Sequence, residues 1–256
     1  MRIDQLLVRR GIAPTRSAAQ RLIAGGAVLW LAPAGWKAPT KAGDEVPADC
    51  ELKLTDDAEL RYLSRGGLKL EGALAAAGVD PRGMVCLDFG QSTGGFTDCL
   101  LQAGAARVVG VEVGHGQLHP ALRDDSRVLA FEGLNVRAIG SGAADAPPAF
   151  AASVPDTGFD LVVADLSFIS LVHALAPAAS LLRTRGTLLA LVKPQFELGP
   201  GAVDARGLVR DESRLSGLRE RIEDDARRAG LKPIGWFDSP IRGGDGNREF
   251  FLHAAK

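Results

Sequence analysis

The sequence predicts an α/β fold: a doubly wound, mostly parallel sheet of seven strands, preceded by a small α+β domain. Three observations support this prediction. From residue 84 onward, short apolar runs alternate with segments of helical periodicity, which is typical of a parallel sheet flanked by helices. A glycine-rich turn follows the first apolar run, in residues 86–97 (CLDFGQSTGGFT). Residues 1–58 differ from the rest of the chain in composition and begin with a basic segment.

The composition is that of an ordinary globular protein. The 256 residues are 46% hydrophobic and 24% charged, with a net charge of -1. No stretch approaches the roughly 20 apolar residues of a membrane-spanning helix, and the first residues lack the apolar segment of a signal peptide. The three cysteines are unclustered, which favours buried thiols in a reducing compartment over disulfides or a metal site. We therefore expect a cytoplasmic protein with no membrane span and no metal.

The domain boundaries are predicted from changes in composition. Residues 1–58 are expected to form the small domain, residues 59–66 a polar linker, and residues 67–256 the large domain. A chain of 256 residues is long enough for one large and one small hydrophobic core.

Two helices and two short strands are expected in the small domain. Apolar residues at helical spacing precede Gly11, which ends the first helix. Thr15 is in position to cap a second helix, which a glycine pair ends. Short strands are expected at 27–31 and 51–54, separated by a loop rich in proline and glycine.

Charge is strongly segregated along this first domain. Lysine and arginine dominate residues 1–41, whereas acidic residues dominate residues 44–59. A compact basic segment in a nearly neutral protein suggests binding to a polyanion, and a solvated charged face is the alternative. The arginines expected on or near the exposed faces of the helical pair are Arg2, Arg9, Arg10, Arg16 and Arg21.

The small domain resembles the alpha-L RNA-binding domain, which occurs in a small-subunit ribosomal protein and in many pseudouridine synthases. The resemblance rests on RIDQLL (residues 2–7), TRSA (15–18) and LIAGGAV (22–28). It departs from the usual pattern at LAPAGW (31–36), where an Asn-Gly strand turn is expected. The resemblance implies RNA binding through phosphates and shape more than through base edges.

In the large domain, strands and helices alternate. Residues 140–157 interrupt the pattern, and their alanine, proline and glycine content predicts a loop with at most one short helix. Strands are expected at 84–87, 107–113, 128–132, 159–164, 186–192, 232–237 and 248–253, and helices at 67–77, 95–103, 117–123, 169–182 and 212–229.

Polar residues stand where the predicted strands end. Asp88 and Gly90 close the first strand, and Glu112 closes the second, about 20 residues later, where an acid commonly binds ribose hydroxyls. Asp165 closes the fourth strand and Lys193 the fifth. Taken singly, each is compatible with a helix cap or a solvated loop charge. Because ligands of open parallel sheets bind at this edge, the four ends together predict a binding site.

The glycine-rich turn is the predicted ligand cradle. Gly90, Gly94 and Gly95 lack Cβ atoms where the backbone and a ligand approach closely, at a helix start with free N–H groups. The spacing G-x-x-x-G-G matches neither the dinucleotide-binding fingerprint nor a phosphate-binding loop. A turn between a strand and a helix without any ligand is the alternative.

Lys193 follows a hydrophobic strand and precedes a proline, in LLALVKPQFELG. A lysine in such a partly buried position is costly unless it has an acidic partner or is deprotonated, and both states are useful to an enzyme. Lys69 and Glu249 are candidates for further charges, although each taken alone is more often a surface residue.

Over nearly its whole length the chain resembles the TlyA family, a haemolysin-named group of ribosomal RNA 2′-O-methyltransferases related to the FtsJ-type enzymes. The resemblance implies the class I methyltransferase fold, which is Rossmann-like, and S-adenosylmethionine as the methyl donor. It also implies a catalytic tetrad of Lys69, Asp165, Lys193 and Glu249. The motifs that carry it are SRGGLKL (64–70), LDFGQSTGGFT (87–97), GHGQL (114–118), LRDDSRV (122–128), DLVVADLSFISL (160–171), LVKPQFELG (191–199) and GNREFFL (246–252).

The resemblance also assigns a donor site. The glycine-rich loop would face the amino-acid end of the donor, Glu112 its ribose and Asn135 its adenine. The chain departs from the family at Gln91, which replaces the usual alanine, at Glu112, which replaces aspartate, and at His115, which replaces tyrosine. The predicted donor-site residues are Asp88, Gly90, Ser92, Gly94, Gly95, Phe96, Glu112 and Asn135.

The implied function is ribose 2′-O-methylation of cytidine in ribosomal RNA, with ribosomal RNA or a ribosomal subunit as the partner. Lys193 is expected beside the target hydroxyl, as a base or as an orienting donor. Two alternatives remain: a non-catalytic RNA-binding or ribosome-assembly factor, and a haemolysin-like membrane-active protein. The pair His115 and His119 does not favour a metal, because no third ligand matches it.

Overall fold

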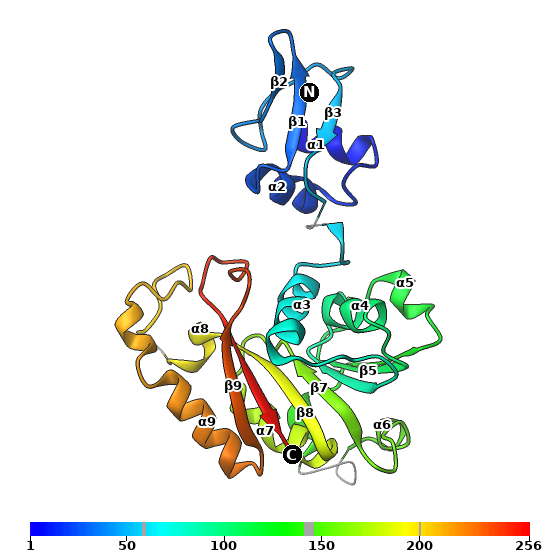
Figure 1. Cartoon of the computed structure of the whole chain (residues 1–256), viewed down its shortest axis with the longest axis vertical. Coiled ribbons are helices and arrows are strands. Elements are labelled where there is room, and N and C mark those ends of the chain that lie inside the picture. The colour runs from blue at the N-terminus through cyan, green and yellow to red at the C-terminus, as the bar shows by residue number, and fades with distance from the viewer. Residues whose placement is uncertain (58–59, 141–145, 200) are drawn as a thin grey trace. The chain divides into compact units, whose positions relative to one another are not determined.

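The computed structural model describes residues 1–57, 60–140, 146–199 and 201–256. The chain divides into two compact units, unit 1 (Met1–Arg65) and unit 2 (Gly66–Lys256), which Figure 1 shows with most of their helices and strands labelled. The predicted linker at 59–66 spans this division, and residue 59 lies outside the described residues. The domain limits at 58 and 67 stay predictions.

Unit 1 packs two helices against a three-stranded antiparallel sheet of order β2-β1-β3. The predicted cap is confirmed, since the Thr15 side chain accepts a hydrogen bond from the backbone N–H of Ala18 at 3.1 Å. The loop expected after β1 instead forms a tight hairpin, because the Pro33–Ala34 turn brings β2 back along β1. The elements are α1 (Ile3–Arg9), α2 (Arg16–Ala24), β1 (Val28–Ala32), β2 (Gly35–Lys37) and β3 (Leu52–Leu54).

Unit 2 contains a seven-stranded sheet of order β6-β5-β4-β7-β8-β10-β9. Strands β4 to β8 pair in parallel, and β10 is antiparallel to both β8 and β9, so the sheet is mostly parallel as predicted. The strands are β4 (Val85–Phe89), β5 (Arg107–Glu112), β6 (Val128–Glu132), β7 (Phe159–Ala164), β8 (Leu182–Val192), β9 (Lys232–Asp238) and β10 (Phe250–Ala255).

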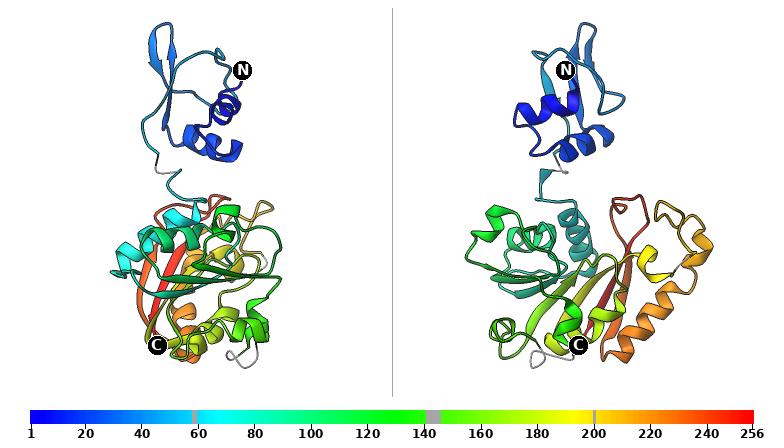
Figure 2. Two further views of the ribbon diagram at one scale, coloured as in Figure 1. Left: turned by 90° about the vertical axis from the view of Figure 1, so that its right-hand side faces the viewer. Right: turned by 180° about the vertical axis from the view of Figure 1, so that it is seen from behind.

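Helices lie on both faces of this sheet, as Figure 2 shows from two further directions. Helices α3 and α4 pack together on one face, and α7 and α9 pack together on the other. The helical elements are α3 (Gly66–Ala77), α4 (Gly95–Gln102), α5 (Pro120–Arg123), the 3-10 turn η2 (Val136–Ile139), α6 (Pro148–Ala151), α7 (Val172–Leu181), α8 (Pro194–Glu197), the 3-10 turn η4 (Glu212–Leu215) and α9 (Leu218–Arg228).

Several predicted boundaries are wrong. The helix expected at 212–229 is split into η4 and α9 because Gly217 adopts φ 76°, which interrupts helical geometry. The helix expected at 117–123 is only α5, beginning at a proline in the first helical position. Helix α8 was not predicted. Within 140–157 the expected short helix is α6, and residues 141–145 lie outside the described part of the chain.

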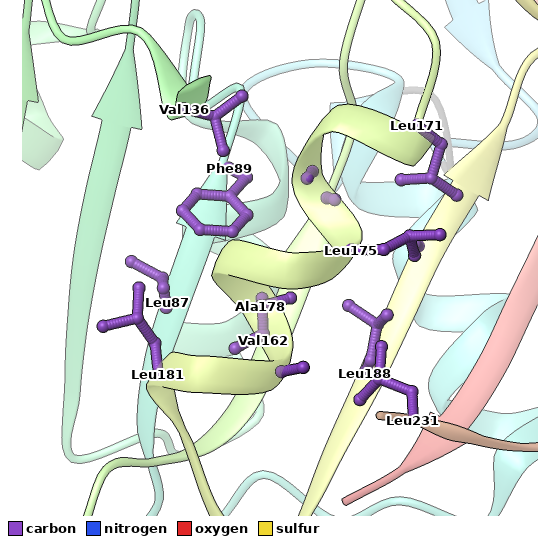
Figure 3. Packing of buried hydrophobic residues seen from close by; sticks show 14 of the residues in the cluster. Leu87, Phe89, Val136, Val162, Leu171, Leu175, Ala178, Leu181, Leu188 and Leu231 are labelled. Atoms are coloured by element: carbon purple, nitrogen blue, oxygen red, sulfur yellow. The ribbon is translucent and has the colours of Figure 1, made fainter. Parts of the chain in front are cut away.

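The main core lies between the sheet and α7. In Figure 3 this helix runs beside Leu87 and Phe89 of β4 and Leu188 of β8, and all three side chains are buried. The apolar strands and the alanine-rich helix therefore form one tightly packed layer beneath the carboxyl ends of the strands.

We predict that Leu175→Ala lowers the free energy of unfolding by about 2–5 kcal/mol, because truncation of a buried leucine leaves a cavity. Leu175 is 1% exposed and lies in α7. The matched control, Val172→Ala, removes a side chain that is 36% exposed in the same helix and should change stability by less than about 0.5 kcal/mol. Denaturant unfolding measures both. Equal losses in the two variants would contradict the packing described here.

Candidate functional site

The candidate site lies where the strand order of unit 2 reverses. Strands β5 and β6 lie on one side of β4, and β7 and β8 lie on the other. In open α/β sheets, ligands bind beyond the carboxyl ends of the strands at such a switch point. Two pockets are formed by the loops at this edge.

The first pocket, here called the donor pocket, has a volume of about 400 Å³. Gly90, Ser92, Glu112 and Asn135 line it, which brings together four of the predicted donor-site residues. Apolar side chains from the loops after β6 and β7 form part of its wall. Gly90 is needed at the rim because its φ is 81° and a Cβ there would lie 2.5 Å from the carbonyl oxygen of Asp165.

Glu112 joins the loops around the donor pocket. Its carboxylate accepts hydrogen bonds from the backbone N–H of Ser92 at 2.9 Å and of Gly114 at 2.7 Å. The Ser92 hydroxyl donates to the side-chain oxygen of Gln117 at 3.1 Å. Gln117 also lines the pocket and was not among the predicted site residues. A carboxylate oxygen accepts more than one hydrogen bond, so these contacts are compatible with a bound ribose.

The other predicted donor residues lie behind the pocket wall. Asp88, Gly94, Gly95 and Phe96 are buried and do not line the donor pocket. Phe96 stacks on Phe251 with ring centroids 6.2 Å apart. These residues therefore support the loop from inside the protein.

A buried chain of polar side chains lies beneath the glycine-rich loop. Gln91 donates its side-chain amide N–H to the Thr97 hydroxyl oxygen at 2.9 Å, and the Thr97 hydroxyl donates to Asp88 at 2.7 Å. A Cβ at Gly110 in the neighbouring strand would overlap the side-chain amide of Gln91. The glutamine that departs from the family pattern is thus packed into space that a glycine leaves open.

Burial raises the pKa of Asp88 to about 7, and the hydrogen bond from Thr97 opposes this shift. Because the folded state holds this proton more tightly than the unfolded chain, the contribution of Asp88 to stability falls as the pH rises from about 4 to about 7.

The second pocket, here called the catalytic pocket, has a volume of about 420 Å³ and contains three members of the predicted tetrad. Lys69 and Glu249 form an ion pair of 2.6 Å, with side chains 9% and 2% exposed. Lys193 forms an ion pair of 2.6 Å with Asp165 and donates to the Ser167 hydroxyl at 2.8 Å. The structure therefore brings all four predicted residues to one site.

The pair of Asp165 and Lys193 connects the two pockets. Asp165 lines the donor pocket, whereas Lys193 lines the catalytic pocket. Ser167 and Phe168 line both. A group held in the first pocket and a group held in the second would therefore meet beside this ion pair.

Phe168 is a site residue that sequence reasoning missed. It is 87% exposed and adopts φ 65°, which is rare for a bulky residue. Strained residues of this kind cluster at functional sites. Its ring lies 5.4 Å from that of Phe196, centroid to centroid. The signal in the sequence was an aromatic residue directly after Ser167, in a segment that begins with Asp165.

Residues 62–256 match the family model for FtsJ-like methyltransferases, and residues 1–29 match that for the S4 domain. The chain belongs to the FtsJ-like methyltransferase family. The 16S/23S rRNA (cytidine-2′-O)-methyltransferase TlyA of Mycobacterium tuberculosis is 40% identical over 251 residues, which is 98% of this chain and 88% of that protein. The predicted resemblance to the TlyA family is confirmed.

Solved structures agree with this membership. A hemolysin-named protein of Streptococcus thermophilus superposes with a TM-score of 0.73 at 38% identity, covering 100% of this chain and 88% of that one. An S-adenosylmethionine dependent methyltransferase from Mesorhizobium loti, at 14% identity, has a TM-score of 0.52 over 73% of this chain and 98% of its own. The likeness to the Mesorhizobium loti protein concerns the fold alone. Together with the family model, it confirms the predicted methyltransferase fold.

Glu197 links two segments next to the candidate site, and sequence reasoning missed it too. Its carboxylate accepts from the Ser170 hydroxyl and from the backbone N–H of Leu171, each at 2.7 Å. These bonds join helix α8, which follows Lys193, to the loop that follows Asp165. Glu197 is 7% exposed. The only hint in the sequence was an acid within the KPQFE segment.

In unit 1, a buried acid binds two of the arginines predicted to contact RNA. Asp4 is fully buried and accepts from Arg2 at 3.0 and 3.1 Å and from Arg16 at 2.9 Å. Hydrogen bonding from Arg2, with further bonds from Arg16 and Gln20, holds the pKa of Asp4 well below its ordinary value. These two guanidinium groups are thus held at defined positions on the helical pair.

The other three arginines predicted to contact RNA differ in their hydrogen bonds and exposure. Arg10 donates to the carbonyl oxygens of Cys50 at 2.6 Å and Ala48 at 2.7 Å, so it fastens the end of α1 to the loop before β3. Arg9 is exposed and Arg21 is half-buried. RNA contact by these five arginines stays a prediction.

The described residues contain no group of three or more histidine, cysteine, aspartate or glutamate side chains arranged to hold a metal ion. His119 accepts a hydrogen bond from the backbone N–H of Ala121 at 3.2 Å and so caps α5. No helix in the described part of the chain is long and apolar enough to cross a membrane.

We predict that Gln91 and Gly110 are coupled. Gln91→Ala removes the donor to Thr97 and should lower the free energy of unfolding by about 1–3 kcal/mol. Gly110→Ala alone should also destabilise, because the new methyl group overlaps the Gln91 amide. In the double variant the methyl group enters the space left by the glutamine. The loss of unfolding free energy in the double variant should therefore be smaller than the sum of the losses in the two single variants. Denaturant unfolding tests this, and simple additivity would contradict the prediction.

We predict that Glu197→Gln lowers the free energy of unfolding by about 1–2 kcal/mol, because the neutral amide has one accepting oxygen in place of two and loses the charge-assisted hydrogen bonds of the carboxylate. The loop that it holds lines the donor pocket, so the affinity for S-adenosylmethionine, measured by calorimetry, should fall as well. The control is Glu220→Gln on the exposed face of α9, with an expected change below about 0.5 kcal/mol. Wild-type stability in Glu197→Gln would refute the role given to this carboxylate.

Proposed function

We propose that this protein transfers a methyl group from S-adenosylmethionine to the ribose 2′-hydroxyl of a cytidine in ribosomal RNA. The observation that carries the proposal is the ion pair of Asp165 and Lys193 at the boundary between the two pockets, with the pair of Lys69 and Glu249 also at the catalytic pocket. The name of the Mycobacterium tuberculosis relative, a 16S/23S rRNA (cytidine-2′-O)-methyltransferase, supports the choice of substrate.

The donor pocket suits a sulfonium nucleoside. Its volume of about 400 Å³ is in the usual range for small-molecule sites. Glu112 supplies a carboxylate for ribose hydroxyls, and the apolar wall formed by Leu134, Val136 and Ile169 suits an adenine ring. Gly90 lets its backbone come close to the carbonyl oxygen of Asp165, which keeps two loops of the pocket together. When bound, S-adenosylmethionine supplies an electrophilic methyl group.

Lys193 is the group proposed to act on the target hydroxyl. Two of its contacts, to Asp165 and Ser167, orient the amine toward the catalytic pocket. As an ammonium group, Lys193 has a third N–H that donates to the hydroxyl oxygen, and the hydroxyl proton then passes to water. As a neutral amine, its lone pair accepts that proton instead. Most of the acceleration would come from alignment of that oxygen with the methyl group. The base role and the orienting role both remain compatible with this geometry.

The pair of Lys69 and Glu249 is proposed to hold the ribose on the other side of the catalytic pocket. Because each charge is nearly buried, the two must neutralise one another when RNA is absent. Phe168, exposed beside this pocket, offers a stacking surface for the base of the target nucleotide.

The S4 domain of unit 1 is proposed to bind the same RNA through phosphate and shape. Such a second binding module raises the local concentration of the target nucleotide at the catalytic unit. We further propose that the substrate is presented within a ribosomal subunit and that the protein is cytoplasmic, because this substrate is found there.

The test is transfer of a tritium-labelled methyl group from S-adenosylmethionine to purified 16S and 23S ribosomal RNA, followed by mass mapping of 2′-O-methylcytidine. Lys193→Ala should reduce the rate by at least about 100-fold, because it removes the group at the reacting oxygen. The control is Lys232→Ala, which removes an exposed lysine of β9 and should leave the rate unchanged. Full activity of Lys193→Ala would refute the assignment.

Binding, methyl transfer and liposome leakage distinguish this enzyme from the two alternative functions. Binding of ribosomal RNA and S-adenosylmethionine without methyl transfer would favour a non-catalytic assembly factor. Relatives that carry a hemolysin name, such as Hemolysin A of Brachyspira hyodysenteriae at 36% identity, make membrane activity worth testing. Dye release from liposomes by the purified protein would favour that reading, and we expect none.

A further inference from the structure

A third pocket in unit 2, here called the arginine pocket, belongs to neither the donor pocket nor the catalytic pocket. It has a volume of about 360 Å³ and lies between the segment 208–215 and the loop 242–248. Among its described lining residues, every charged side chain is an arginine: Arg210, Arg242 and Arg248. Three guanidinium groups around one concave surface form a site for an anion.

A buried asparagine fixes the shape of this pocket. Asn247 is 3% exposed, donates to the carbonyl oxygen of Gly207 at 2.8 Å and accepts from the backbone N–H of Val209 at 2.9 Å. The backbone carbonyl oxygen of Asn247 accepts a hydrogen bond from the backbone N–H of Gly243 at 2.9 Å. The two segments that form the pocket are therefore joined to each other in the folded protein.

The arginines are oriented by their neighbours. Arg210 pairs through Nε with Asp204 at 2.6 Å, and Arg248 pairs through Nε with Asp238 at 2.8 Å. Arg242 donates to a backbone carbonyl oxygen at 3.1 Å. Neither aspartate lines the pocket, and both pairs are at the surface, where an ion pair contributes little to stability. Each of the three guanidinium groups is thus held by at least one neighbour in the folded protein.

The arginine pocket adjoins the catalytic pocket through the covalent chain. Arg248 immediately precedes Glu249, and Pro194 of the arginine pocket immediately follows Lys193. Gly207 likewise lines one pocket and Leu208 the other. Residues adjacent in the chain therefore line different pockets, and the same segments form walls of both.

We propose that the arginine pocket binds a backbone phosphate of the RNA strand next to the nucleotide that is methylated. This inference rests on the proposed function. The planar guanidinium group matches a phosphate with parallel N–H donors, and such a contact positions a strand without reading its sequence. The pocket gives the catalytic unit its own anchor for RNA, additional to that of unit 1.

The experiment measures binding of the full-length protein to purified 16S and 23S ribosomal RNA over a range of KCl concentrations. Arg210→Gln and Arg242→Gln should each weaken binding by about tenfold at constant salt. Each should also reduce the slope of log K against log[KCl] by about 0.7–1, because one phosphate contact fewer releases fewer counterions. Affinity for S-adenosylmethionine, measured by calorimetry, should stay at the wild-type value, since neither arginine lines the donor pocket.

Two further variants serve as controls. Arg82→Gln removes a charge that is 80% exposed and lines none of the three pockets, so binding and slope should stay as in the wild type. Arg242→Lys keeps the positive charge but loses the planar fork, so it should restore the slope with weaker affinity than the wild type.

Three outcomes would overturn the proposal. Wild-type affinity and slope in both glutamine variants would show that the pocket does not contact RNA. Weaker binding with an unchanged slope would show that the arginines act on loop shape and not on phosphate. If the wild-type protein neither binds nor methylates ribosomal RNA, both the proposed function and the phosphate site are refuted. If the wild-type protein methylates ribosomal RNA and the glutamine variants bind it normally, only the phosphate site is refuted.

Discussion

The site depends on the register of the parallel sheet at β4. The backbone N–H of Asp165 donates to the carbonyl oxygen of Phe89 at 2.9 Å, and that of Gly90 donates to Val111 at the same distance. These bonds extend the pairing of β4 with β7 and β5 past the last strand residues. The loops that carry the donor pocket and the Asp165 carboxylate therefore start in contact with one another, and a side chain at position 90 would separate them.

Charge balance is the second constraint. Lys69 comes from the first helix of unit 2 and Glu249 from the residue before its last strand, yet the two form an ion pair with little exposure. Lys193 and Asp165 follow neighbouring parallel strands. Removal of one partner of a buried pair leaves an uncompensated charge, which costs about 3–5 kcal/mol. The residues proposed for catalysis are thus also coupled to the stability of the fold.

Polar side chains behind the pockets hold the site in shape. Gln91 and Thr97 connect the glycine-rich loop to Asp88 from below, and Glu197 ties the loop after β7 to the turn after β8. None of them needs to touch a substrate to matter, because a small displacement of an oriented group is costly to catalysis. The Asn247 side chain likewise joins the segments that lie between the catalytic and arginine pockets, through its hydrogen bonds with Val209 and Gly207.

The sequence by itself determined the alternation of strands and helices, the Thr15 cap and the order of polar residues at strand ends, because these depend on neighbours along the chain. The four positions of the proposed tetrad came from motifs that resemble a known family. Only the tertiary structure decided that Lys69 pairs with Glu249, that β10 runs antiparallel and that Asp88 lies beneath the donor pocket. It also placed Phe168 at the wall of both pockets and Glu197 between the two segments behind them. Such features depend on contacts between distant segments, and a single residue pattern carries no information about which segment will pack against it.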